Sequence, residues 1–148
     1  MSYTYLLYHI VVRTKRSEPT ILPAHERELY MYIYQFTKAH DSALYRVNGM
    51  PDHIHILVSL HPSIAISDFM CDLKTATSKM MKNAKDKYPM FGGWESEYFA
   101  STVSKNDQEK IRQYIINQKE HHKKVNSREE LIQLCIENGI PYNEKIME

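Results

Sequence analysis

The stretch GMPDHIHILVSL, residues 49–60, decides the fold and raises the question of function. Successive side chains of a β-strand point to opposite faces of the sheet. The even positions 54–60 are all aliphatic and share one face, whereas His53 and His55 share the other. We therefore expect a strand with one face in the core and a pair of imidazoles on the opposite face.

The rest of the chain predicts strands and helices on both sides of this segment. Tyr, Val and Ile are frequent in residues 3–13, as in strands, and alternation predicts another strand at 97–103. Residues 43–60 predict a β-hairpin with Asn48–Gly49 in its turn, lengthened by Pro51 beyond the two-residue type. Apolar residues at helical spacing predict helices, with these approximate bounds: 23–40, 64–85, 104–122 and 127–137. Ser104 with Asp107, and Ser127 with Glu130, have the spacing of capping pairs at the last two helix starts.

This order is β-α-β-β-α-β followed by C-terminal helices, which indicates the α+β class and the ferredoxin-like split β-α-β antiparallel sheet. Two helices would cover one face of the sheet and leave the histidine face for the helix after the fourth strand. We expect a single domain over residues 1–148, with a core of about 3–124 and a helical tail of about 125–148.

Composition places the chain among ordinary globular proteins, with 148 residues, 43% hydrophobic and 25% charged. Residues 1–124 carry 17 Lys and Arg against 13 Asp and Glu, whereas 125–148 carry 2 against 5. A mildly basic body is compatible with nucleic-acid binding without establishing it. No apolar run approaches the roughly 18 residues of a membrane helix. Cys71 and Cys135 are far apart in sequence, so we expect reduced, packed thiols in a soluble, cytoplasmic protein with no membrane partner.

The predicted helix 104–122 offers partners for the two histidines. Tyr114 and Gln118 are four residues apart, hence about 40° apart around a continuous helix, and His121 falls about 20° from Tyr114. A phenol and an amide would then converge on the His53–His55 pair. A tyrosine nucleophile with a pKa near 10 is ionised in about one molecule in a thousand at pH 7, a deficit of about 4 kcal/mol. A divalent cation at the imidazoles could offset that deficit.

Other interpretations of these residues stay open. His-x-His triplets are common by chance, and Tyr114 is one of eleven tyrosines. Asp52 could orient a ligand, although a cap of the turn is favoured. His121 and His122 are expected at a solvated helix end. Trp94 could stack on an unpaired base or pack over the core.

Two segments, in this order and spacing, carry a family resemblance. GMPDHIHILVSL resembles the His-hydrophobic-His motif of the single-tyrosine HUH transposases, the TnpA-like enzymes of small insertion sequences of the 200/605 type. YIINQKEHHKK, with its Tyr-x-x-x-Gln spacing, is similar to their catalytic helix. YHIVVRTK and WESEYFASTVS also resemble family segments, so the resemblance spans about residues 3–124.

The resemblance implies an enzyme that cleaves and transfers DNA strands. His53, His55 and Gln118 would bind a divalent metal, Mg²⁺ or Mn²⁺. Tyr114 would attack a phosphate of single-stranded DNA, forming a 5′-phosphotyrosine and releasing a 3′-hydroxyl. The partners would be single-stranded DNA with hairpins at the element ends and a second copy of the chain, with Tyr114 acting in cis or in trans. The alternative is a domesticated or inactive relative that binds DNA hairpins without strand transfer. Nicking and replication-initiation enzymes of the wider HUH group are usually larger.

Overall fold

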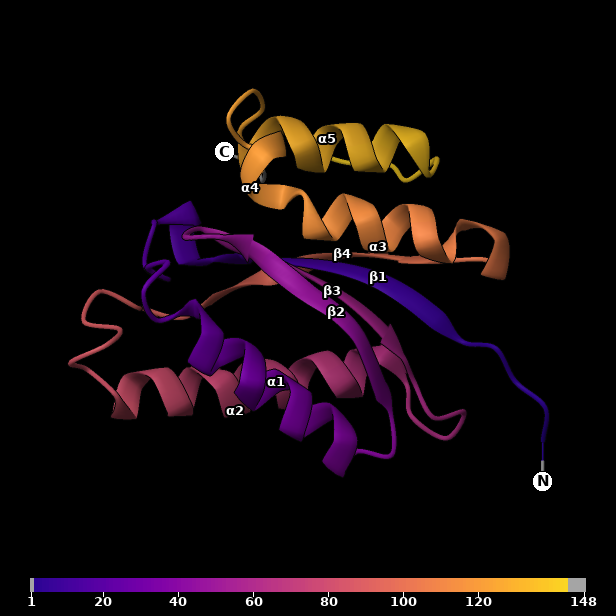
Figure 1. The fold of residues 1–148 in the computed structure, drawn as a ribbon, viewed down its shortest axis with the longest axis horizontal. Coiled ribbons are helices and arrows are strands. Elements are labelled where there is room, and N and C mark those ends of the chain that lie inside the picture. The colour runs from indigo at the N-terminus through magenta and orange to yellow at the C-terminus, as the bar shows by residue number, and fades with distance from the viewer. Residues whose placement is uncertain (1, 144–148) are drawn as a thin grey trace.

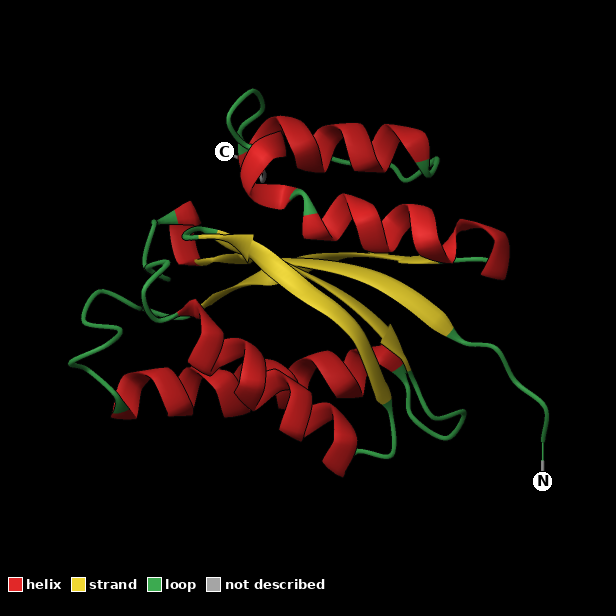
Figure 2. Cartoon of the chain, in the orientation of Figure 1, coloured by secondary structure: helices red, strands yellow, loops and turns green. Residues whose placement is uncertain are grey.

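The computed structural model describes residues 2–143 and arranges them around one sheet (Figure 1). Helices α1 and α2 lie on one face of this sheet, and α3, α4 and α5 lie on the other (Figure 2). The elements follow in this order: β1 (Leu7–Thr14), η1 (Lys15–Ser17), α1 (Glu26–Ala39), β2 (Ala43–Met50), β3 (His53–Ser59), α2 (Ile66–Asn83), β4 (Trp94–Thr102), η2 (Lys105–Asp107), α3 (Gln108–Ile116), α4 (Gln118–His121) and α5 (Ser127–Glu137).

The sheet has the strand order β2-β3-β1-β4, and all its neighbouring pairs are antiparallel. Because β1 and β3 are central, the strand that carries the histidine pair is held on both edges. This is the ferredoxin-like α+β arrangement predicted from the order of the elements.

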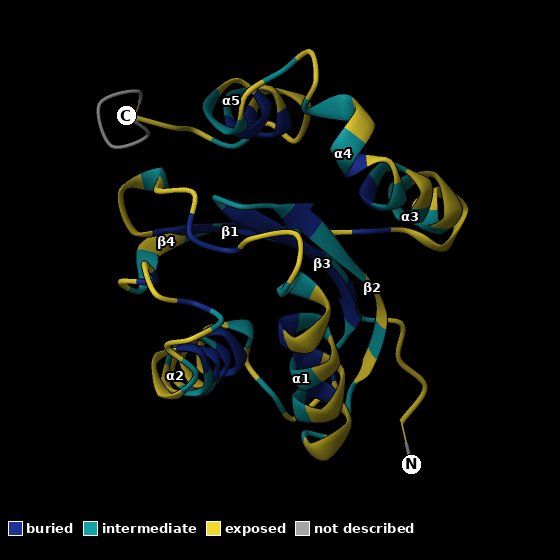
Figure 3. Ribbon diagram, turned by 60° about the vertical axis from the view of Figure 1, so that its left-hand side comes forward, coloured by how far each residue is buried: buried dark blue, intermediate teal, exposed yellow. Residues whose placement is uncertain are grey.

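Residues on the two faces of β3 have separate environments. Ile54, Ile56 and Val58 lie in the main core with α1 and α2, each at most 1% exposed. His53 and His55 lie on the other face and are 0% exposed, because the C-terminal helices cover them (Figure 3). The predicted division into an apolar face and a histidine face is therefore confirmed.

The predicted turn of the β2–β3 hairpin was wrong. Met50 pairs with His53, so the connection is the two residues Pro51 and Asp52, while Asn48 and Gly49 belong to β2. Gly49 is needed for a different reason, since a Cβ there would lie 2.2 Å from the carbonyl oxygen of His53. The glycine permits close approach of two strands and does not form the turn.

Helix α5 packs onto the sheet across β1 and β4. Leu131, Leu134 and Cys135 form a second buried cluster with Val11 and Phe99. This packing fixes the position of the acidic residues on α5 relative to β3. Cys135 is a buried free thiol as expected, whereas Cys71 is exposed rather than packed.

Trp94 lies at the start of β4 and packs against the core. Its ring meets Phe91 edge to face, and its indole nitrogen donates a hydrogen bond to Thr77. These contacts agree with the packing interpretation of Trp94. Within residues 2–143, no helix combines the length and apolar character needed to cross a membrane.

Candidate active site

The two imidazoles on β3 are each fixed through their Nδ1 atom. The Nδ1 of His53 lies 2.7 Å from a carboxylate oxygen of Asp52, and the Nδ1 of His55 lies 2.8 Å from the Nε2 of His9. The Nε2 atoms are therefore left to face the same side of the sheet. A ring nitrogen held in this way sets the orientation of the other nitrogen, as in many metal-binding histidines.

Asp52 has a role that the sequence did not favour. Its carboxylate contacts His53 through one oxygen and accepts a hydrogen bond from the Ser127 hydroxyl, 2.8 Å away, through the other. Asp52 thus links β3 to the start of α5 and orients His53, which is the less favoured of the two interpretations that the sequence left open. The cap of α5 is Asn126, which accepts from the Glu129 amide, and not the predicted Ser127.

The predicted catalytic helix is interrupted. Helix α3 ends at Ile116, Asn117 leaves helical geometry at φ −91° and ψ 16°, and α4 begins at Gln118. The side-chain amide of Asn48 on β2 donates to the carbonyl oxygens of residues 115 and 116, which satisfies the end of α3. The 40° angle computed for a continuous helix therefore does not apply.

Tyr114 and Gln118 nevertheless both reach the histidine face. The Tyr114 hydroxyl donates a short hydrogen bond to Glu130. The Gln118 side chain is buried, with its Oε1 3.4 Å from the Nε2 of His53 and its Nε2 donating to Glu130 at 3.0 Å. All four predicted site residues thus meet in one chain, at a point under α5.

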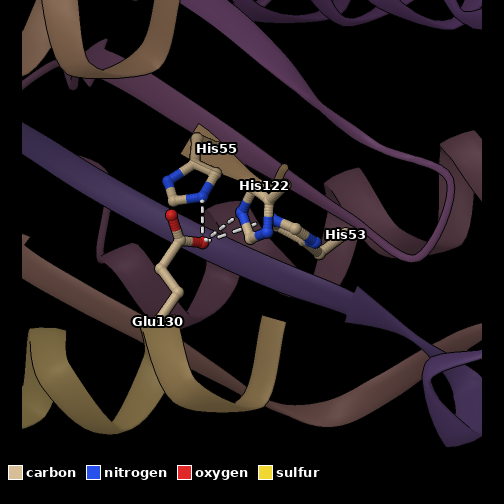
Figure 4. A group of neighbouring side chains, drawn as sticks. All are labelled: His53, His55, His122 and Glu130. Carbon is tan, nitrogen blue, oxygen red and sulfur yellow. Dashed lines mark hydrogen bonds and ion pairs between the residues drawn. The ribbon is translucent and has the colours of Figure 1, made fainter. Parts of the chain in front are cut away.

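The centre of this arrangement is Glu130, which sequence reasoning assigned only to a helix cap. The side chain is 2% exposed, and one of its oxygens lies 2.8 Å from the Nε2 of His55 and 3.2 Å from the Nε2 of His53. Figure 4 shows the carboxylate reaching from α5 to the imidazoles. Glu130 lies more than seventy positions after the histidines, and nothing in its own segment marks it as a site residue.

His121 and His122 also join the site, in contrast to the expected solvated helix end. The His122 side chain is 4% exposed, and its Nε2 lies 3.1 Å from a Glu130 oxygen. The Nε2 of His121 lies 3.2 Å from the other Glu130 oxygen and 3.4 Å from the Tyr114 hydroxyl. The break at Asn117 is what turns α4 toward the sheet.

His9 is a further residue that sequence reasoning missed. It is 1% exposed on β1 and lies on the histidine face, because its neighbours Ile10 and Val12 belong to the opposite core. The alternation of the first strand could have indicated this residue, because His9 shares its face of the strand with the apolar residues Leu7 and Val11. Burial and the adjacent His55 lower the pKa of His9 to about 3, so this imidazole is neutral.

The carboxylates set the charge of the site. Burial would lower the pKa of His53, but hydrogen bonds with Asp52 and Glu130 raise it to about 9. Burial dominates at His55 and lowers its pKa to about 4 despite Glu130. Burial would raise the pKa of Glu130, but the imidazoles of His122, His53 and His55 hold it well below its usual range. Glu130 is therefore a buried anion among imidazoles.

Tyr114 is held in its protonated form in this arrangement. Burial and the facing Glu130 carboxylate raise the pKa of the Tyr114 phenol above its ordinary value of 10. The residue is still reached from outside, since it lines an open hollow of about 490 Å³ with Asn117, His121 and Lys124.

A model of the family described as "Transposase IS200 like" matches residues 2–118. The chain belongs to this family. The matched segment contains His53, His55, Tyr114 and Gln118 and ends before His122 and Glu130. The family match therefore covers the residues that the sequence motifs singled out and does not extend to the α5 carboxylate.

Individual relatives agree with the assignment to the IS200-like transposases. The ISDra2 transposase TnpA of Deinococcus radiodurans is 41% identical over 73 residues, which cover 47% of this chain and about half, 52%, of that protein. The transposase for insertion sequence element IS200 of Salmonella typhimurium is 29% identical over 120 residues, 78% of each chain.

Two solved structures share the fold. A transposase structure from Deinococcus radiodurans R1 aligns with a TM-score of 0.62 and 30% identity, over 80% of this chain and 95% of that chain. A REP-associated tyrosine transposase bound to a REP hairpin aligns with a TM-score of 0.63 at 13% identity, over 84% of this chain and 74% of that chain. The second likeness concerns the fold alone.

Proposed function

We propose that this IS200-like transposase cleaves and rejoins single-stranded DNA through a 5′-phosphotyrosine on Tyr114, with a divalent metal at its active site. The observation that carries the proposal is the meeting of the Tyr114 hydroxyl, the His53–His55 pair and Gln118 at one buried point of a single chain. A phenol placed beside convergent metal-type ligands is what a covalent tyrosine mechanism requires.

The residues at this point fit a divalent cation. Imidazole nitrogens and an amide oxygen of three buried side chains converge here, and His53, His55 and Gln118 would hold the ion, Mg²⁺ or Mn²⁺. A bound cation supplies Lewis acidity and neutralises charge on the phosphate that is attacked. Asp52 and His9 keep the two imidazoles in the orientation that this role needs.

Tyr114 performs the covalent step. Its phenolic oxygen forms a bond to the phosphorus and gives up its proton, while the bond from phosphorus to the 3′ oxygen breaks and that oxygen gains a proton to leave as a 3′-hydroxyl. Rejoining reverses these changes with another 3′-hydroxyl. Because Tyr114 contacts Glu130 in the described arrangement, the phenol has to leave this carboxylate before it can attack.

The DNA partner would be single-stranded and would carry hairpins at the element ends. The hollow beside Tyr114 opens next to Lys124, whose ammonium can contact a phosphate backbone. Because Tyr114 and both histidines meet within one chain, the arrangement supports action in cis. Dimerisation remains a prediction from the family resemblance.

The test uses the purified full chain and labelled oligonucleotides that span the ends of its own coding element. With Mg²⁺ or Mn²⁺ we expect a denaturant-resistant protein–DNA band and a shortened strand, and with a chelator neither product. The same sequences annealed as full duplexes serve as the control and should give no adduct. Hairpin binding without any adduct in either metal would overturn the strand-transfer chemistry and favour a relative that only binds DNA.

A further inference from the structure

Three imidazoles from two parts of the chain point at one oxygen atom. One oxygen of Glu130 lies 2.8 Å from the Nε2 of His55, 3.2 Å from that of His53 and 3.1 Å from that of His122 (Figure 4). His53 and His55 come from β3, His122 follows α4, and Glu130 comes from α5. The sheet and the C-terminal segment therefore each contribute two of these side chains.

The Glu130 carboxylate has more polar neighbours than it can accept hydrogen bonds from. Together the two oxygens of Glu130 face four imidazole nitrogens, the Tyr114 hydroxyl and the Gln118 amide. A carboxylate has about four lone-pair sites, and a single oxygen has about two. Three Nε2 atoms around one oxygen are thus more donors than hydrogen bonding can satisfy. Several imidazole nitrogens gathered beside a buried carboxylate oxygen are instead the ligand arrangement that a shared cation requires.

We propose that His122 and Glu130 bind the same divalent cation as His53 and His55. Within residues 2–143, these four side chains offer ligand atoms that all lie within 4.8 Å of one another. The inference rests on the proposed metal-dependent function and adds two ligands to it, from a segment beyond the family match. Gln118 then has a second task, because its amide donates to Glu130 at 3.0 Å and orients the carboxylate.

This ligand set selects a class of metal. Mg²⁺ favours carboxylate, carbonyl and water oxygens, whereas imidazoles favour first-row transition ions. With His122 the site holds three imidazoles and one carboxylate. We therefore expect Mn²⁺ or a later transition ion to bind more tightly than Mg²⁺.

The arrangement also connects the metal to the nucleophile. One oxygen of Glu130 faces the three imidazoles, and the other accepts the hydrogen bond from Tyr114. Leu131 and Leu134 seat α5 on the sheet, so the carboxylate is held in place between metal and phenol. The C-terminal helix is thereby part of the active site and not an appendage to the core.

The experiment measures Mn²⁺ and Mg²⁺ binding to the full metal-free chain by isothermal titration calorimetry, so that DNA cleavage is not the readout. The variants are Glu130→Gln and His122→Ala, with Glu129→Gln and His61→Ala as matched controls at exposed positions. Glu129→Gln removes the same charge from the same helix, and His122→Ala removes a ligand without removing an anion. Both test variants should lose Mn²⁺ affinity by about 100-fold or more, since even the partners of ligating residues contribute about 10–100-fold.

The outcomes separate this inference from the proposed function. Loss of affinity in Glu130→Gln and His122→Ala, with unchanged controls and circular dichroism of a folded chain, supports both ligands. Wild-type affinity in both variants, together with loss of binding in His53→Ala, overturns the inference and leaves the His53–His55 metal site standing. Absence of Mn²⁺ and Mg²⁺ binding by the wild-type chain overturns the inference and removes the metal from the proposed function as well.

Discussion

Replacement of Tyr114 by phenylalanine is expected to abolish covalent capture of single-stranded DNA while hairpin binding is retained. The change removes the only atom of this side chain that can bond to phosphorus and keeps its ring. Loss of the nucleophile in a covalent mechanism costs on the order of 10⁶-fold in rate, which places the variant at background. The measurement is the yield of denaturant-resistant protein–DNA adduct on labelled oligonucleotides, with hairpin affinity determined by gel shift on the same strands.

The Tyr114→Phe variant should remain folded, which makes its loss of activity interpretable. Glu130 loses one donor but keeps the Gln118 amide and the His121 imidazole on the same oxygen. A single hydrogen bond contributes about 1 kcal/mol net, so the melting temperature should change little. Tyr34→Phe, at an exposed tyrosine on α1 across the sheet, is the matched control and should keep full adduct formation. An adduct that persists in Tyr114→Phe would place the nucleophile on another residue, which peptide mapping of the adduct would identify.

The alternation of β3, together with the order of the elements, was sufficient to predict the fold and the shared face of His53 and His55. A period of two assigned the aliphatic residues to the core and both histidines to the other face, and the structure confirms this division. The order of elements then fixed the topology, because a β-α-β-β-α-β chain packs in few ways. These features depend on local patterns, and local patterns can be read from a sequence.

The remaining part of the site depends on contacts between distant segments. The Glu130 carboxylate contacts His55 because α5 packs over the sheet. The only local pattern at position 130 was its spacing from Ser127, which predicted a helix cap. His122 reaches the same place because the helix breaks at Asn117, where Asn48 of β2 satisfies the freed carbonyl oxygens. Tertiary contacts overrode the helical pattern in this segment, so an angle calculated along the sequence could not find these two residues.

In the β2–β3 hairpin, the Asn-Gly pattern marked a glycine that the fold requires, but it predicted the wrong position for the turn. Asn-Gly is the strongest short signal for a tight turn, yet the turn consists of Pro51 and Asp52. Gly49 pairs with Ile54 within the ladder, and its missing side chain leaves room for the backbone of β3. The Asn-Gly pattern correctly indicated that the hairpin needs a glycine at position 49. The reason is steric, because the backbone of β3 leaves no room for a side chain there.

Gly49→Ala is therefore expected to destabilise the fold and to weaken metal binding at the proposed site. The added Cβ would lie 2.2 Å from the carbonyl oxygen of His53 and 2.8 Å from the Cα of Ile54, and these backbone atoms can move only if β2 and β3 separate. Overpacking costs about 1–3 kcal/mol, and about 1 kcal/mol corresponds to 2–4 °C in a domain of this size. Scanning calorimetry should show a melting temperature lower by several degrees. Isothermal titration calorimetry should show reduced Mn²⁺ affinity, because His53 is displaced.

Gly92→Ala provides the matched control for this substitution. A Cβ at Gly92 meets no described atom within 4 Å, and the backbone there does not have a positive φ. Replacement of such a glycine leaves stability unchanged or raises it by about 0.4–1 kcal/mol, because the unfolded chain loses freedom. Equal melting temperatures and equal metal affinities for Gly49→Ala and Gly92→Ala would mean that β2 shifts without cost. The close approach of Gly49 to β3 would then not be what holds His53 in place.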